Sequence, residues 1–313
     1  MPLRVHLALV VVQVLFGLWP VFGTVVLEHL SPQALIGVRT LVATPLLFLL
    51  FRPALPAADA DGRRPWGLLA VIGFLGIASN QLLFAEGLQR AGPINAALLT
   101  LLIPALTLLL AWALGREHPS RSRLAGVVVA LSGALLLART DGFDLSDRAV
   151  VGNLAIIANT ACYAGYLVLA RPLATRIGGA AMVTWAFAFG ALEALPLTGP
   201  ALVDAPFEAF EPFTWLSLVF IIVGATVGTY ALNAYALARA DSSIVAIYIY
   251  VQPIVTATGA WWVLGRVPEG HTVFAGVLIA AGVALCTGLV GPGAGERLRN
   301  AIKSRPPGSD GGR

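Results

Sequence analysis

Long runs of apolar residues, separated by short polar segments, recur along the chain from the first residues to about residue 290. A helix needs about 20 mostly apolar residues to cross the hydrocarbon core of a bilayer. Ten runs meet or approach this length, which predicts an all-α integral membrane protein with ten transmembrane helices. The predicted spans are residues 5–27, 32–51, 66–87, 94–114, 124–138, 150–169, 180–200, 213–238, 243–264 and 272–290.

The composition agrees with a chain that lies in a membrane. Of its 313 residues, 58% are hydrophobic and 12% are charged, whereas a soluble domain carries about 25% charged residues. The lipid bilayer is therefore the expected solvent for much of the apolar surface. The two cysteines, Cys162 and Cys286, both lie in apolar runs, so we expect no disulfide framework.

Basic residues are distributed unevenly between the segments on the two sides of the membrane. If the N-terminus is cytoplasmic, about 15 Lys and Arg residues lie on the cytoplasmic side and about 4 lie outside. This follows the positive-inside rule and predicts a multi-pass protein of the cell (inner) membrane with both termini in the cytoplasm. The basic residues lie in short loops and in the tail, so no nucleic-acid partner is expected. Residues 291–313, rich in Gly, Pro and Arg, are predicted to be a disordered cytoplasmic tail.

The two halves of the chain share one pattern at a separation of about 149–150 residues. It consists of a short break, a helix with a proline in its middle, a Gly-Arg turn and a Gly-containing helix. Its main members are Arg90, Pro104, Trp112 and Gly115 in the first half, and Arg239, Pro253, Trp261 and Gly265 in the second. Because each half holds five predicted helices, the second enters the membrane in the opposite sense. We therefore predict two inverted five-helix repeats, residues 1–140 and 149–290, with the substrate site in a central cavity between them.

Short motifs in both halves carry a family resemblance. They are the run from Phe16 to Pro20, Arg39, residues 86–96 followed by Pro104, and residues 236–240 followed by Pro253. This pattern resembles the drug/metabolite transporter superfamily, in particular its EamA-type branch, from about residue 5 to about residue 290. The resemblance implies two five-helix bundles around a central cavity and transport of metabolites such as amino acids, nucleosides or amphiphilic drugs. The segment from Gly265 to Glu269 departs from the family's usual Gly-Glu pair, which leaves any shared role of that acid open.

Three ionisable residues lie inside predicted spans, where a charge is costly unless it is paired or hydrated. Arg39 is a candidate for binding an anionic substrate group, or for pairing with an acid in a structural role. Glu86 lies near the outer end of the third span, where it could equally face the interface. Glu193 lies deeper and is the best candidate for a protonatable coupling residue, with a structural role as an equal alternative. A proton is therefore the candidate coupling ion.

Polar and aromatic residues share faces of several predicted helices, as Thr226 and Tyr230 do in the eighth span. The cavity candidates are Gln13, Trp19, Asn80, Gln81, Asn159, Tyr163, Tyr166, Tyr230, Asn233, Tyr248 and Gln252. Together they would line a cavity suited to a neutral or zwitterionic small molecule. The alternative is interhelical hydrogen bonding that only holds the bundle together. Pro20, Pro104 and Pro253 are candidate hinges, because proline kinks or ends a helix.

Enzyme motifs are absent from the sequence. The histidines at positions 6, 29, 118 and 271 lie far apart, and no metal-ligand spacing or phosphate-binding Gly-Lys-Ser/Thr run occurs. We therefore expect no catalytic residue, cofactor or metal. The favoured function is secondary transport of small metabolites, such as amino acids, related solutes or drugs, by alternating access and in the direction of export. A membrane-embedded enzyme acting on lipid and a non-transporting scaffold are the alternatives, and no oligomeric state is predicted.

Overall fold

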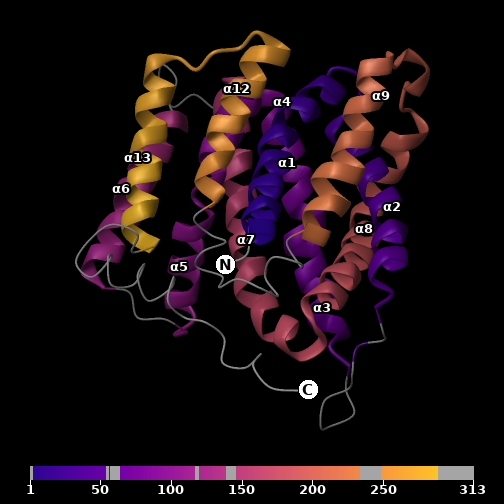
Figure 1. Ribbon diagram of the computed structural model, residues 1–313, viewed down its shortest axis with the longest axis horizontal. Helices are drawn as coiled ribbons and strands as arrows, with labels where there is room; N and C mark the ends of the chain where they lie inside the picture. Colours follow the sequence, from indigo (N-terminus) through magenta and orange to yellow (C-terminus); the bar gives the residue numbers. More distant parts are fainter. Residues whose placement is uncertain are drawn as a thin grey trace.

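A computed structural model describes residues 3–53, 56, 64–116, 120–138, 146–232 and 248–287. Within these ranges every regular element is helical, and Figure 1 shows the helices packed side by side along a common direction. Seven of the described helices are long and apolar enough to cross a membrane. The predicted all-helical membrane class is therefore confirmed at this coarser level. The predicted tail, residues 291–313, and Asn233 lie outside the described residues.

The helices follow the apolar runs of the sequence. The first half of the chain forms α1 (Leu3–Leu27), α2 (Pro32–Phe51), α3 (Trp66–Gly73), the π-helical segment η1 (Phe74–Ala78), α4 (Ser79–Thr100), α5 (Ile103–Ala113) and α6 (Arg121–Ala138). The second half forms α7 (Arg148–Ile177), α8 (Gly179–Val203), the 3-10 turn η2 (Phe207–Ala209), α9 (Pro212–Val219), the π-helical segment η3 (Phe220–Gly228), the 3-10 turn η4 (Tyr248–Val251), α12 (Gln252–Leu264) and α13 (Gly270–Thr287). The clearest difference from the predicted spans is α7, which continues to Ile177, beyond the predicted end at residue 169.

Capping residues and prolines set several helix starts. Ser31 caps α2, since its hydroxyl accepts a hydrogen bond from the Ala34 amide at 3.2 Å and Pro32 stands in the first turn. Asp147 caps α7 in the same way, accepting from the Ala149 amide at 2.7 Å. Both caps lie at the end of the bundle where α1 ends at Leu27 (top of Figure 1). This end is named the distal end, and the end where α1 begins is the proximal end.

The predicted break between the third and fourth spans coincides with a kink in α4. Gly92 has φ 81° and ψ 171° inside this helix, a conformation that glycine adopts without steric cost. Pro93 follows and has no backbone N–H that the kink could leave unpaired. The third and fourth predicted spans therefore meet directly at Gly92, where the chain changes direction, and the fourth continues through the end of α4 into α5.

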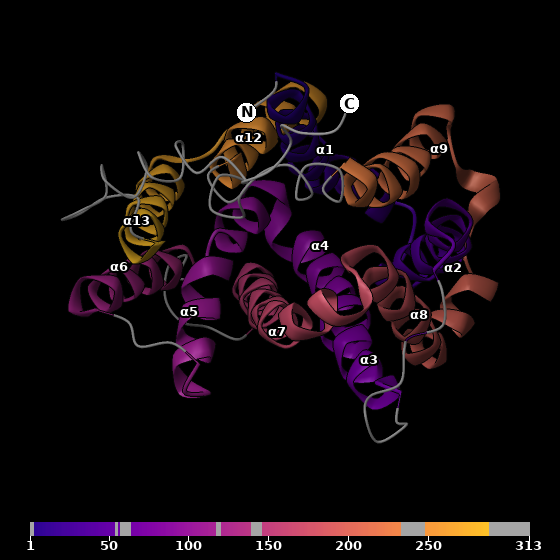
Figure 2. The ribbon, with the colours of Figure 1, turned by 60° about the horizontal axis from the view of Figure 1, so that its bottom comes forward.

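Small residues allow the closest helix contacts. The most extensive pairs are α6 with α13 and α4 with α7, followed by α2 with α8 and α1 with α12. A Cβ atom on Gly282 of α13 would lie 2.3 Å from the Ala130 amide nitrogen and 2.6 Å from the Gly126 carbonyl oxygen of α6. In lipid the hydrophobic effect does not drive helices together, so close van der Waals packing of this kind stabilises their association. Figure 2 shows the α6–α13 pair at one side of the bundle and the α2–α8 pair at the other.

Candidate functional site

Arg39 of α2 is a buried cation at a point where both halves of the chain meet. It is 6% exposed, and its Nε donates a hydrogen bond to the Thr226 hydroxyl of η3 at 2.8 Å. Its guanidinium carbon lies 4.5 Å from the centroid of the Trp19 ring of α1, which is a cation–π contact. No carboxylate pairs with Arg39 in the part of the chain that the structure describes. Among the described residues, the side chains in direct contact with this charge are a neutral hydroxyl and an aromatic face.

Several aromatic side chains lie near Arg39. Tyr230, which follows η3, lies within electrostatic range of Arg39, Tyr163 and Tyr166. Its ring packs edge-on against Phe187 of α8 at 5.3 Å between centroids, and the rings of Tyr163 and Tyr166 stack at 5.2 Å. These side chains, together with Trp19 and Thr226, are named the Arg39 site. The site combines one cation with phenol and indole groups, which can hold an anionic group beside an apolar body.

Two of the predicted amide residues hold helices together. The Asn159 side chain donates to the Asn80 carbonyl oxygen at 2.7 Å, and the Asn80 side chain donates to the Asn159 carbonyl oxygen at 3.3 Å. This reciprocal pair joins α4 to α7. Gln81, next to Asn80, is 5% exposed, and its Oε1 is buried without a hydrogen-bond partner among the described residues. Gln81 therefore keeps an acceptor free, whereas Asn80 and Asn159 satisfy each other.

Three further candidates, Gln13, Tyr248 and Gln252, lie where α1 packs against η4 and α12. Gln252 donates to the Gln13 side-chain oxygen at 2.6 Å, and the Thr256 hydroxyl donates to the Gly17 carbonyl oxygen at 2.6 Å. Nearer the proximal end, His6 Nδ1 lies 2.5 Å from the Tyr248 hydroxyl. These three contacts are named the α1–α12 seam. Gln13 and Gln252 are thus brought together, whereas Tyr248 meets His6.

The two acidic candidates lie apart from Arg39. Glu86 accepts a hydrogen bond from Gln33 of α2 at 2.6 Å and forms an ion pair with Arg90, one helical turn further along α4. Glu193 of α8 is half-buried, and its Oε2 is buried without a hydrogen-bond partner among the described residues. Glu86 is therefore paired near the distal end, whereas Glu193 keeps one carboxylate oxygen free.

The predicted hinge prolines occupy two kinds of position. Pro20 stands inside α1, and its carbonyl oxygen accepts a hydrogen bond from the Thr24 hydroxyl at 2.9 Å. Pro104 and Pro253 stand in the first turns of α5 and α12, where a missing N–H costs no hydrogen bond. Their role as hinges stays a prediction.

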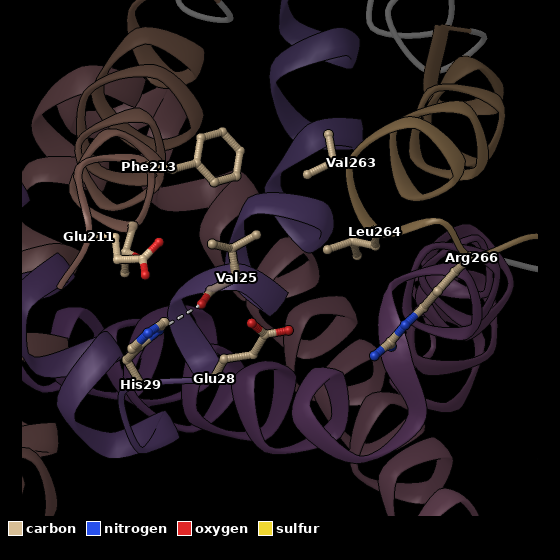
Figure 3. A pocket seen from close by; sticks show the side chains of 9 residues that line it. Val25, Glu28, His29, Glu211, Phe213, Val263, Leu264 and Arg266 are labelled. Carbon is tan, nitrogen blue, oxygen red and sulfur yellow. Dashed lines mark hydrogen bonds between the residues drawn. The ribbon is translucent and has the colours of Figure 1, made fainter. Parts of the chain in front are cut away.

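A cavity of about 360 Å³ opens at the distal end between α1, α9 and the end of α12 (Figure 3). It is lined by Val25, Glu28, His29, Glu211, Phe213, Thr214, Val263, Leu264 and Arg266. The sequence analysis did not include these residues among the site candidates. Their charged members stand at span ends and in short loops, where the sequence pattern is the same as that of a solvated surface.

Comparison with known proteins shows what this chain is similar to. Residues 3–139 and 150–288 each match the EamA-like transporter family. An uncharacterized transporter of Archaeoglobus fulgidus is 27% identical over 91% of this chain and 97% of its own length. A probable amino-acid metabolite efflux pump of Salmonella typhimurium is 29% identical over 88% of this chain and 92% of its own length. A probable terminal-alkyne amino-acid exporter of Streptantibioticus cattleyicolor is 28% identical over 74% of this chain and 78% of its own length.

A solved structure shares the fold. It covers 97% of this chain and 100% of its own length with a TM-score of 0.61, at 22% sequence identity. It is described only as the crystal structure of a protein. The likeness therefore concerns the arrangement of the helices alone.

Proposed function

Because the chain belongs to the EamA-like transporter family, we propose that it is a secondary transporter that exports small amino-acid-like metabolites by alternating access. The family membership confirms the resemblance found in the sequence. Relatives named as an amino-acid metabolite efflux pump and an amino-acid exporter support the substrate class. The observation that carries the proposal is the buried Arg39, which has no carboxylate partner among the described residues.

The chemistry of Arg39 favours a substrate with a carboxylate. An uncompensated charge inside a membrane is costly, so it is retained where it has a function. A guanidinium group binds a carboxylate through two parallel hydrogen bonds, and among the described residues the hydrogen bond of Arg39 is the one from its Nε to Thr226. The rings of Trp19, Tyr163 and Tyr230 offer an apolar wall beside it. An amino acid or a related metabolite satisfies both requirements.

Helix packing supports ten spans arranged as two inverted repeats, 1–140 and 149–290. In such an arrangement α1 corresponds to α7, α2 to α8, α5 to α12 and α6 to α13. The helix contacts agree with this correspondence. The corresponding helices α2 and α8 pack on each other, as do α6 and α13, and replacing each helix of the α1–α12 contact by its counterpart gives the α5–α7 contact, which is also present. The π-helical segments η1 and η3 also stand in corresponding helices. An inverted repeat places the substrate site between the halves, where Arg39 meets Thr226.

The proposed topology is a multi-pass protein of the inner cell membrane with both termini in the cytoplasm. The distribution of Lys and Arg supports it, since the proximal loops are the basic ones. The distal end then faces outward, and the α1–α12 seam lies toward the cytoplasm. In this interpretation the seam closes the cytoplasmic half in the present structure, while the cavity at the distal end is open.

Counterflow in proteoliposomes tests the function. Wild-type protein is expected to exchange labelled amino acids, with nucleosides and cationic drugs as the comparison panel. Arg39→Gln should abolish exchange of solutes that carry a carboxylate, whereas Arg121→Gln, which removes an exposed charge at the start of α6, should not. Absence of exchange over the whole panel would overturn the proposal.

The same vesicles test proton coupling through Glu193. With a pH gradient applied, exchange by wild type should respond to the gradient. Glu193→Gln cannot take up or release a proton, so exchange should persist but become indifferent to the gradient. A mutant that still responds would remove Glu193 as the coupling residue and leave the carrier itself in place.

A further inference from the structure

The cavity at the distal end, named the distal vestibule, separates charges of opposite sign. Glu28 at the end of α1 and Glu211 just before α9 contribute carboxylates, and Arg266, just after α12, contributes a guanidinium. Figure 3 shows the Glu28 carboxylate and the Arg266 guanidinium pointing toward one another across the opening. No ion pair among the described residues joins Arg266 to either carboxylate. The two carboxylates and the guanidinium therefore line the same cavity without forming an ion pair across it.

The position of Arg266 is set by the backbone around it. The Arg266 amide donates to the Ala260 carbonyl oxygen at 3.1 Å, and Gly265 before it has φ 65°, which ends α12 in a left-handed turn. The side chain then extends toward the kink of α4, where a Cβ on Gly92 would lie 3.4 Å from Arg266 Nη1. The guanidinium thus lies on the α4 side of the vestibule, opposite the loop that holds Glu211.

Apolar side chains share the lining with the charges. Phe213, Val25 and Leu264 line the vestibule together with the charged residues. The cavity volume of about 360 Å³ lies in the range of small-molecule sites, about 300–1,000 Å³. The vestibule therefore offers carboxylates, a guanidinium and apolar side chains around the volume of one small solute.

We propose that the distal vestibule is a second binding site, separate from the Arg39 site, that holds a zwitterionic solute. The ammonium group of the solute lies at Glu28 and Glu211, and its carboxylate lies at Arg266. A solute that is only a cation would leave Arg266 without a partner, and one that is only an anion would leave both carboxylates without one. The proposal rests on the proposed function for its place on the transport route, whereas binding itself is measured independently of transport.

Thiol protection of the full-length protein in liposomes tests this site. Val263→Cys places a reporter in the vestibule wall, and Val267→Cys places a matched reporter on the exposed loop outside the lining. The labelling rate with a membrane-impermeant maleimide is measured with L-phenylalanine, 2-phenylethylamine or 3-phenylpropionate present. Wild-type protein, with its native Cys162 and Cys286, gives the background labelling. L-phenylalanine should slow labelling at position 263 and leave position 267 unchanged.

The charge variants then assign the two ends of the solute. Glu28→Gln and Arg266→Gln, each combined with Val263→Cys, should raise the L-phenylalanine concentration that gives half-protection about tenfold, the loss of one charge-assisted contact. Arg266→Lys, which keeps the charge, should lose less than Arg266→Gln. Each single-charge analogue should protect only at much higher concentration than L-phenylalanine.

Three outcomes would overturn the site: equal protection by all three compounds, protection that persists in both glutamine variants, or equal protection of position 267. Protection with the expected charge pattern in a protein that shows no counterflow would sustain the vestibule and reject the transport function. Counterflow that depends on Arg39 without any protection at position 263 would sustain the transport function and reject the vestibule as a binding site.

Discussion

At the scale of single residues, the contact between Arg39 and Trp19 places a buried cation against an aromatic ring. A guanidinium 4.5 Å from an indole centroid is held by the ring's electron-rich face. Thr226 fixes Nε from the other half of the chain, at 2.8 Å. Arg39 is therefore oriented in advance by two groups that do not neutralise it.

Changes at Trp19 should weaken substrate binding in proportion to the lost cation–π contact. Such a contact is worth about 0.5–2 kcal/mol, so Trp19→Leu should raise the apparent KM for an amino-acid substrate by about twofold to thirtyfold. Trp19→Phe keeps an aromatic face and should have a smaller effect. Apparent KM in proteoliposome uptake is the measurement, and equal values for the two variants would argue against the aromatic contact.

The residues of the Arg39 site stand out as candidates in the sequence, but their contacts do not. A charged residue inside an apolar run is visible in the sequence, and helical periodicity placed Tyr163 and Tyr166 on one face. The pairing of Gln13 with Gln252 joins residues 239 positions apart, which periodicity within one helix cannot predict. The distal vestibule was missed for a related reason, because Glu28 and Arg266 resemble ordinary solvated loop charges until the fold brings them together.

At the scale of helices, glycine decides how closely the elements approach. Gly126 and Gly282 lie in the two Gly-containing helices of the repeated pattern, and the structure brings them into contact with each other across α6 and α13. The small residues allow this close backbone approach, which is a common way for helices to associate in lipid.

Gly282→Ala should destabilise the α6–α13 pair. The new methyl group would lie 2.3 Å from the Ala130 amide nitrogen, so the helices must separate, at a cost of about 1–3 kcal/mol. Gly270→Ala at the start of the same helix meets no atom within 4 Å and serves as the control. Thermal unfolding in detergent should show a lower Tm for Gly282→Ala only. An unchanged Tm would mean that the helices can shift apart without loss of packing.

At the scale of the whole molecule, the helix contacts place an open vestibule and a closed seam at opposite ends of the same pair of helices. The α1–α12 seam joins α1 to α12 through Gln13, Gln252 and Thr256, whereas Val25 of α1 and Leu264 of α12 line the distal vestibule. Alternating access by rocking of one half against the other requires such a pair of helices to separate at one end as it closes at the other.

Locking the seam should therefore stop the transport cycle without unfolding the protein. Gln13→Cys with Gln252→Cys puts two thiols where side chains already meet at 2.6 Å, so a short bifunctional thiol reagent should join α1 to α12. Counterflow should fall to background after cross-linking and recover when a cleavable linker is reduced, whereas each single variant should be insensitive to the reagent. Protection of Val263→Cys by L-phenylalanine should persist in the locked protein, because the distal vestibule stays open while the seam is closed. Full counterflow in the cross-linked protein would show that α1 and α12 do not separate during transport, and the moving contact would then have to lie between other helices.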